Sequence, residues 1–168
     1  MANESGLVRT ANLDDVQRII DLASPYVGKL IPYIHDIEQV AIHIDYFLVY
    51  ELDGQVVGAR HVVPSKDEFG TEFLLDTVQV PADFVGYFNS LRCSSAFMAH
   101  VICPYSGSQA RILNYLKERY EYLFSWTSKA SPAYRSLQRH GFDFIVTRRV
   151  WNQYKSDFSE FSLGRWIR

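Results

Sequence analysis

The sequence has 168 residues and a net charge of −2; 48% of its residues are hydrophobic, 21% charged and 15% aromatic. This length suits one domain that buries its own core, and the composition excludes a disordered or collagen-like chain. No apolar run reaches the roughly 18 residues that span a bilayer, and the start lacks the regions of a signal peptide, so we expect a cytoplasmic protein without membrane contact.

A strand and two helices are predicted at the start of the chain. Residues 7–11 alternate apolar and polar side chains, and Asn12 followed by Asp15 resembles a helix cap with an acidic first turn. Residues 16–23 repeat apolar side chains at helical spacing, which predicts the first helix. A weaker stripe, interrupted by a proline, predicts a second helix within residues 30–43.

The next part of the sequence predicts a hairpin. Two β-rich runs, residues 46–52 and 55–63, flank an Asp-Gly pair at 53–54, the dipeptide typical of a two-residue hairpin turn. A further strand over residues 72–80 and a short helix over residues 81–92 are expected to follow.

The second half predicts alternating strands and helices. Residues 95–103 are almost all apolar, as expected of a strand buried on both faces, and a helix with an apolar stripe follows over residues 109–120. A strand is expected over residues 122–127. Residues 142–147 and 148–154 predict two more strands.

The segment SPAYRSLQRHGF, residues 131–142, predicts a helix with clear boundaries. Ser131 supplies a capping hydroxyl, Pro132 occupies the first helical position and Gly141 ends the helix. No linker divides the chain, so we expect one domain over residues 1–168, with residues 155–168 as a C-terminal tail that could serve as an interaction segment.

Charge is unevenly distributed along the chain. Residues 1–108 hold six Lys and Arg against fourteen Asp and Glu, a net −8, and residues 109–168 hold eleven against five, a net +6. A basic half suits an anionic ligand such as a phosphorylated cofactor, and an acidic half suits an amine. The alternative is that both are solvated faces that interleave in space.

Metal chemistry has little support in the sequence. Cys93 and Cys103 are ten residues apart with no CxxC pair, and we interpret both as reduced thiols. The five histidines follow no metal-binding spacing, and the motifs of serine hydrolases, P-loop enzymes and zinc proteases are absent. We therefore expect no metal site. The histidines are residues 35, 43, 61, 100 and 140.

The order of predicted elements resembles that of the GNAT (GCN5-related) N-acetyltransferases, and four stretches resemble the family locally: residues 7–20, 47–62, 99–116 and 131–142. The resemblance covers most of the chain and implies an α/β fold. It implies a central twisted mixed sheet of six to seven strands, flanked by about four to five helices. It also implies transfer of an acyl group, with acetyl expected, from acyl coenzyme A to an amine.

In this family the loop after the fourth strand wraps the pyrophosphate of acyl coenzyme A, because backbone N–H groups at a helix start bind phosphate. Here the loop keeps Gly107 and Ala110, has Gln109 and Arg111 where small residues are usual, and is one residue short. The alternative is a loop that no longer binds coenzyme A. The resemblance implies these cofactor-binding residues: Val101, Ile102, Cys103, Ser106, Gly107, Ser108, Gln109, Ala110, Arg111 and Ser128.

Two residues are candidates for catalysis. The family's last helix often carries a tyrosine that donates a proton to the departing thiolate; Tyr134 lies one helical turn before that position, at Leu137. His100, in the strand before the loop, could face the acceptor. The alternatives are that Tyr134 packs in the core and that His100 is a hydrogen-bonded core residue.

Two other functions compete with acyl transfer. The altered loop, the displaced tyrosine and an aromatic-rich end would suit a catalytically degenerate GNAT-like protein, phage-encoded ones included, that binds a protein partner. A nucleic-acid-binding role through Arg135, Arg139, Arg148 and Arg149 is the weakest reading, since the chain is acidic overall and has no known motif. The sequence leaves the acceptor and the oligomeric state open, a homodimer included.

Overall fold

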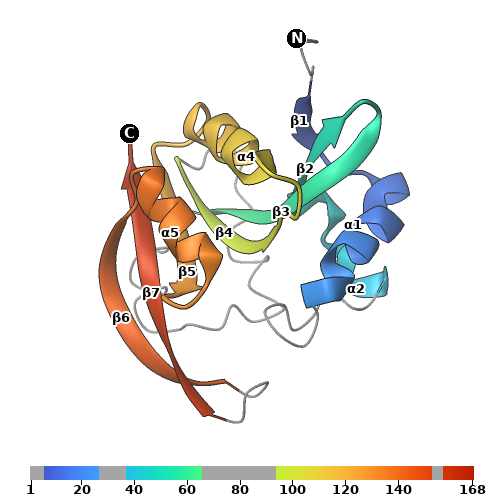
Figure 1. Ribbon diagram of the computed structural model, residues 1–168. Helices are drawn as coiled ribbons and strands as arrows, with labels where there is room; N and C mark the ends of the chain where they lie inside the picture. Colours follow the sequence, from blue (N-terminus) through green and yellow to red (C-terminus); the bar gives the residue numbers. More distant parts are fainter. Residues whose placement is uncertain (1–5, 27–36, 66–93, 153–156) are drawn as a thin grey trace. The chain divides into compact units, whose positions relative to one another are not determined.

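The computed structural model describes residues 6–26, 37–65, 94–152 and 157–168 (Figure 1). Their seven strands follow the hydrogen-bonded order β1-β2-β3-β4-β5-β7-β6, with both parallel and antiparallel neighbours. The mixed α/β architecture predicted from the sequence is confirmed. The chain divides into two compact units, Met1–Val62 with His100–Tyr115 and Val63–Ala99 with Leu116–Arg168. Within the described residues, no helix is long and apolar enough to cross a membrane.

The first unit holds an antiparallel ladder and the helices that follow it in sequence. Its strands are β1 (Leu7–Thr10), β2 (Phe47–Leu52) and most of β3 (Gln55–Ser65), and its helices are α1 (Val16–Ala23), α2 (Ile37–Ile42) and the start of α4 (Ser108–Lys117). Short 3-10 turns occupy Leu13–Asp15, Ser24–Tyr26 and Ile44–Tyr46. Ile19 and Ala23 of α1 pack with Phe47 and Val49 of β2 in one buried cluster, which joins helix to sheet.

The predicted cap at the start of α1 is confirmed, with a 3-10 turn inserted before the helix. The Asn12 side chain accepts the Asp14 N–H at 2.9 Å, and the Asp15 carboxylate accepts the Asn12 N–H at 2.8 Å. Arg9 on β1 donates twice to Asp15, at 2.7 and 2.9 Å, and once to Glu51 of β2, at 2.9 Å. These charged hydrogen bonds hold the pKa of Asp15 below its ordinary value.

The hairpin between β2 and β3 is also confirmed. Asp53 has φ of 50° and Gly54 φ of 76°, the pair of left-handed conformations that a two-residue hairpin turn requires. Tyr50 pairs with Gly58, and the register then shifts by one residue, so Glu51 pairs with Val56.

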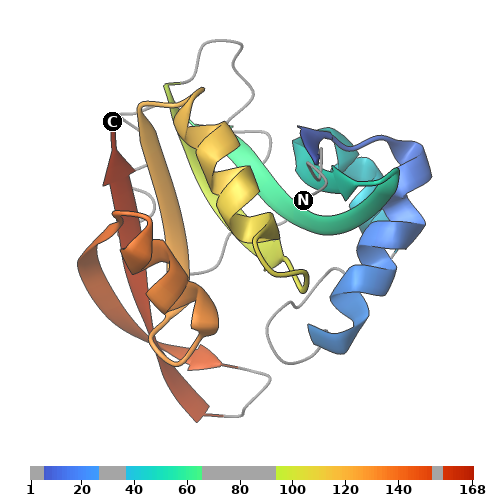
Figure 2. The same ribbon diagram turned by 45° about the horizontal axis from the view of Figure 1, so that its top comes forward.

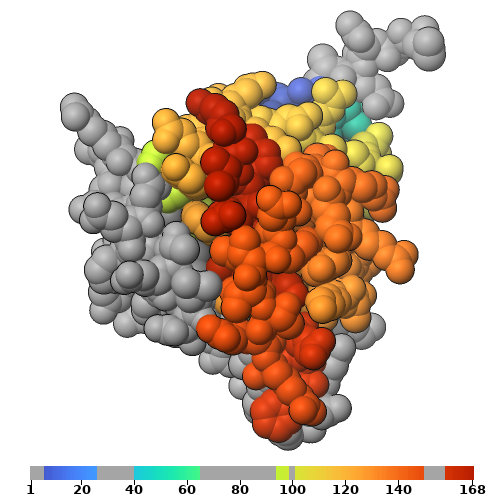
Figure 3. All heavy atoms as spheres, turned by 90° about the vertical axis from the view of Figure 1, so that its left-hand side faces the viewer, coloured from blue at the N-terminus to red at the C-terminus, as the bar shows by residue number. Residues whose placement is uncertain are grey.

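The second unit holds the first part of β4 (Ser95–Ile102), then β5 (Tyr122–Ser128), β6 (Asp143–Asn152), β7 (Asp157–Ile167) and the helix α5 (Pro132–Arg139). Figure 2 shows α5 lying along one face of these strands, and Figure 3 shows α5 beside β6 on the surface of this unit. The Ser131 hydroxyl accepts the Ala133 N–H, Pro132 opens the helix and Gly141 has φ of 79°, so the predicted helix boundaries are confirmed.

The end of the chain differs from the sequence-based expectation. Residues expected as a tail form β7, which pairs with β5 along one edge and with β6 along the other. The two strands expected at residues 142–147 and 148–154 are one strand, β6. The strand expected over residues 72–80 and the helix expected over residues 81–92 lie outside the described residues, as do Cys93 and the start of the second predicted helix.

Candidate functional site

The turn between β4 and α4 is the candidate anion-binding site. β4 ends at Ile102, the chain turns through Tyr105 and Gly107, and α4 begins at Ser108. Gly107 has φ of 87°, a left-handed conformation that glycine adopts without the steric cost other residues incur. The turn therefore leads the chain directly into the first turn of a helix ten residues long.

Ser108 holds this turn in place. It is fully buried, and both its N–H and its hydroxyl donate to the carbonyl oxygen of Tyr105, at 3.2 and 2.7 Å. Gly58 of β3 lies so close that a Cβ added there would be 2.8 Å from the Ser108 Cβ. Only glycine at position 58 lets the start of α4 approach β3 this closely.

The first turn of α4 presents backbone N–H groups. The Arg111 N–H donates to the Gly107 carbonyl at 3.1 Å, which closes the first turn. The N–H groups of Gln109 and Ala110 meet no acceptor in the described part of the chain. Such amides, together with the positive end of the helix dipole, attract phosphate and other anions.

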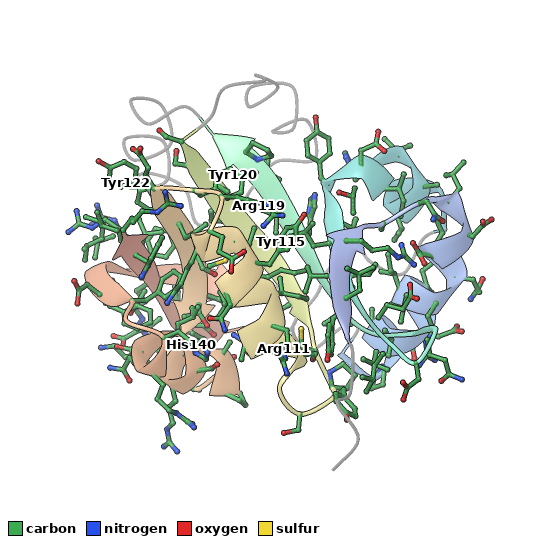
Figure 4. The ribbon with its side chains drawn as sticks, turned by 90° about the horizontal axis from the view of Figure 1, so that it is seen from above. Arg111, Tyr115, Arg119, Tyr120, Tyr122 and His140 are labelled. Carbon is green, nitrogen blue, oxygen red and sulfur yellow. The ribbon has the colours of Figure 1, made fainter. Side chains whose placement is uncertain are left out.

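The side chains of the turn add polar donors. Ser106, Gly107 and Arg111 are exposed, and Figure 4 shows Arg111 and Tyr115 on the same side of α4. The Gln109 Nε2 is buried and has no hydrogen-bond partner among the described residues. The Ser108 hydroxyl, by contrast, is already donated to Tyr105 and serves the turn itself.

Two further buried or half-buried residues, Cys103 and Arg60, belong to the same unit as this turn. Burial raises the pKa of the Cys103 thiol, which donates to the Ala59 carbonyl at 3.7 Å. Arg60 of β3 is 1% exposed; burial lowers its pKa to about 10, so it stays charged at neutral pH. Arg60 was not predicted from the sequence as a site residue. Its only signal there is that an arginine lies within an otherwise apolar strand.

The other predicted residues of β4 have different surroundings. Ile102 is fully buried and belongs to the core of the first unit, and Val101 is half-buried. His100 lies within β4, and its side chain is not among those that the structure describes.

The parallel ladder between β4 and β5 is short. It pairs Ser95 with Tyr122 and ends where Phe97 pairs with Phe124, although β5 continues to Ser128. Immediately beyond this point the Ser125 hydroxyl donates to the Met98 carbonyl at 3.0 Å. The side chain thus satisfies a strand carbonyl that the backbone of β5 no longer reaches.

Tyr134 and Ser128 lie in the second unit. The Tyr134 ring stacks on Phe144 of β6, with centroids 3.9 Å apart and planes 13° apart, and the residue is half-buried. Ser128 organises the turn into α5: its carbonyl accepts the Ser131 N–H at 2.9 Å, and its hydroxyl accepts the Ala130 N–H at 3.3 Å.

The structure therefore brings the predicted residues together in two groups. Residues 101–111 are consecutive in the chain and lie in the first unit, and Ser128 and Tyr134 flank one turn in the second. Among the described residues, no three His, Cys, Asp or Glu side chains are grouped so that they could hold a metal ion.

No protein-family model matches this chain, and no curated relative matches its sequence. Its fold, however, is that of many solved GNAT acetyltransferases. The ribosomal-protein-alanine N-acetyltransferase of Brucella melitensis has a TM-score of 0.66 at 16% identity, over 96% of this chain and 99% of that one.

Two further structures show the same fold. The loading GNATL domain of CurA from Lyngbya majuscula has a TM-score of 0.69 at 14% identity, covering 96% of this chain and 97% of the domain. The protein yncA of Salmonella typhimurium, a putative acetyltransferase solved with its cofactor acetyl-CoA, has a TM-score of 0.68 at 11% identity, covering 97% of this chain and 94% of that one. The chain thus has the GNAT fold.

Proposed function

We propose that this protein is an acyl-coenzyme A-dependent N-acyltransferase, with acetyl as the transferred group. The observation that carries the proposal is the β4–α4 turn, where left-handed Gly107 leads into a helix whose Gln109 and Ala110 N–H groups have no acceptor in the described residues. A turn of this kind suits a pyrophosphate. The likeness to a fold solved with acetyl-CoA supports the same ligand.

Each part of the turn has a distinct task in this proposal. The N–H groups of Gln109 and Ala110 bind the pyrophosphate, with the Ser106 hydroxyl and the Arg111 guanidinium as side-chain donors. Gly107 gives the phosphate room, and Ser108 keeps the turn closed. The backbone of Val101, Ile102 and Cys103 lies along the acyl-bearing arm, and Ser128 is the remaining residue that the family resemblance implies for the cofactor.

In the reaction, the amine nitrogen of the acceptor forms a bond to the thioester carbon, the carbon–sulfur bond breaks, and the products are an N-acyl amine and coenzyme A. The protein has to accept one proton from the ammonium and return one to the thiolate. We assign the first task to His100 and the second to Tyr134. A backbone N–H near Ile102 stabilises the charge on the carbonyl oxygen.

Calorimetric titration with acetyl-CoA tests the proposal. We expect binding in the micromolar range; no heat at about millimolar ligand would overturn it and favour a protein that binds a partner without catalysis.

A pair of glycine variants then locates the site. Gly107 and Gly54 both have positive φ, and a Cβ added at either would meet nothing within 4 Å. The backbone strain of a Gly→Trp change is therefore similar at the two positions, but only Gly107 lies in the proposed phosphate turn. We expect Gly107→Trp to abolish acetyl-CoA binding and Gly54→Trp to retain it. Equal binding by the two variants would show that the cofactor lies elsewhere.

A further inference from the structure

The α5 segment of the second unit carries exposed positive charge with no acidic residue among its own. Residues 128–140 contain Lys129, Arg135 and Arg139 but no Asp or Glu, and all three cations are exposed. Lys129 lies in the turn before α5. Arg135 and Arg139 are four residues apart in the helix, so they lie on one exposed face of it. None of these three side chains forms an ion pair with a described residue.

Arg149 of β6 adds a fourth cation on the same side of the sheet. Phe144 pairs with Gly164 and stacks on Tyr134 of α5, so the Gly164 side of β7 is the side that α5 covers. Glu160 lies four residues before Gly164 and points to that side, as does Arg149, its partner across the strands. Figure 3 shows α5 and β6 beside each other on the surface. We call these four cations the basic face: Lys129, Arg135, Arg139 and Arg149.

An exposed aromatic ring orients the guanidinium of Arg149. The Arg149 Cζ lies 5.1 Å from the ring centroid of Phe158, which is 51% exposed. Stacking on a ring uses the flat side of a guanidinium and leaves its N–H groups at the edge to bind another group. Glu160 is the nearest acidic residue across the strands, but in the described part of the chain it forms no ion pair with Arg149. The edge is therefore available to a carboxylate from outside.

The stability of α5 does not explain these charges. Like charges four residues apart on a helix repel each other, and cations near the start of a helix oppose its dipole. Lys129 precedes the capping Ser131, and Arg135 lies in the first turn, which contains no acidic residue. Only Arg139, in the last turn, interacts favourably with the dipole. A ligand that binds the cations together accounts for the arrangement better than folding does.

The spacing of the two helix arginines selects the shape of that ligand. Four residues of α-helix rise about 6 Å. In an extended chain, alternate residues point to one side and lie about 7 Å apart. An extended segment with Asp or Glu at alternate positions therefore presents one carboxylate to Arg135 and the next to Arg139. Each guanidinium can then bind its carboxylate through two parallel hydrogen bonds.

The charge of the remaining chain favours a short acidic segment over a nucleic acid. The whole chain has a net charge of −2, so the residues outside the basic face have a net charge of −6. A nucleic acid that extends beyond the face would meet an excess of negative charge, which opposes its binding. An acidic peptide segment a few residues long contacts the face alone.

We infer that the basic face is a docking surface for an extended acidic segment of a partner protein, with carboxylates at alternate positions. This inference goes beyond acyl transfer and does not depend on it, because the basic face includes none of the residues assigned to the cofactor or to proton transfer. Acetyl-CoA is absent from each experiment below, so the docking surface is tested separately from the proposed activity.

Fluorescence anisotropy with two labelled peptides tests the spacing. One peptide alternates glutamate with serine; the other has the same number of glutamates at every third position, so that successive carboxylates point to opposite sides of an extended chain. We expect the alternating peptide to bind with a Kd of the order of 100 μM at low ionic strength, and about tenfold more weakly at physiological salt. It should bind about threefold more tightly than the second peptide. Equal affinity for the two would overturn the inference.

Two sets of arginine variants test the surface. Replacing both Arg135 and Arg139 by glutamine should weaken binding of the alternating peptide about tenfold, since two charge-assisted contacts are lost. Glutamine is a good helix former, so the melting temperature should not fall. Arg149→Gln and Arg148→Gln remove the same charge from adjacent positions, but Arg148 points to the other side of the sheet. We expect about threefold weaker binding for Arg149→Gln and little change for Arg148→Gln; equal effects would overturn the inference.

Two further measurements test the other occupants of the face. A labelled single-stranded DNA of the same net charge as the peptide should bind more weakly than the alternating peptide, and tighter binding that Arg135→Gln reduces would overturn the inference in favour of a nucleic acid. Sedimentation of the protein alone at low salt should give the same mass for the wild type and for the variant with both Arg135 and Arg139 replaced. A self-association lost in that variant would instead assign the face to a second copy of the chain.

Discussion

The β4–α4 turn and the α5 segment relate sequence to geometry in opposite ways. The turn departs from the family pattern at Gln109 and Arg111, yet it keeps a left-handed glycine and N–H groups at a helix start. The α5 segment matches the pattern well, with Ser131 and Gly141 at its boundaries, yet its tyrosine ring is stacked on Phe144. A site made of backbone amides tolerates side-chain change, whereas a side-chain role depends on its neighbours.

The largest effect is expected from Tyr134→Phe, which removes the phenolic hydroxyl and retains the ring that stacks on Phe144. If Tyr134 protonates the thiolate, kcat should fall by about 100-fold, the lower range for loss of a general acid, with an unchanged melting temperature. Steady-state kinetics and thermal unfolding measure the two quantities. An unchanged kcat would show that the Tyr134 ring serves only in packing against Phe144, unlike the backbone amides of the β4–α4 turn, which bind the cofactor in our proposal.

Gly58 and Gly164 give a matched test of close packing in the two regions. An added Cβ at Gly58 would lie 2.8 Å from the Ser108 Cβ, whereas at Gly164 it would lie 3.1 Å from the edge of the Phe144 ring. We expect Gly58→Ala to lower the free energy of unfolding by about 2 kcal/mol and to weaken acetyl-CoA binding. Gly164→Ala should destabilise less and leave binding intact; the reverse order in denaturant unfolding would contradict this account.

Asp15 gives a pH-dependent reference, since it stabilises the first unit without belonging to the turn. Its pKa is lowered by hydrogen bonds from Arg9, so the ion pair stabilises the fold above the ordinary pKa of 3.8 and is lost as pH falls through the lower folded value. Asp15→Asn should cost about 1.5 kcal/mol at pH 7 and less at pH 3. Urea unfolding at both pH values measures the difference. An equal cost at both would show that the negative charge of Asp15 does not contribute to stability.

The smallest effects are expected from two serines with similar local roles. Ser131 caps α5 and Ser108 closes the β4–α4 turn, each through one side-chain hydrogen bond. Replacing either by alanine should cost about 1 kcal/mol of unfolding free energy. Only Ser108→Ala should also weaken acetyl-CoA binding in calorimetry, and a loss of binding in Ser131→Ala would mean that α5 takes part in the cofactor site.

Local signals in the sequence were sufficient for several elements. The Asp53-Gly54 turn, the Asn12 cap and the boundaries of α5 depend on residues close in sequence, and the structure confirms all three. Strand β7 was not predicted, because its eleven residues mix charged and aromatic side chains and only its pairing with β5 and β6 makes it a strand. Arg60 was not predicted either, because its burial depends on contacts between distant segments.

The sequence by itself determined the α/β class, the helix caps, the hairpin and the candidate phosphate turn, since each depends on short-range backbone preferences. Tertiary structure alone decided that Gly58 admits Ser108, that Tyr134 stacks on Phe144 and that Arg149 lies on the side of the sheet that α5 covers. These facts join residues 10 to 50 positions apart in the chain. Strand register and close packing set such contacts, and neither is encoded in any single stretch of sequence.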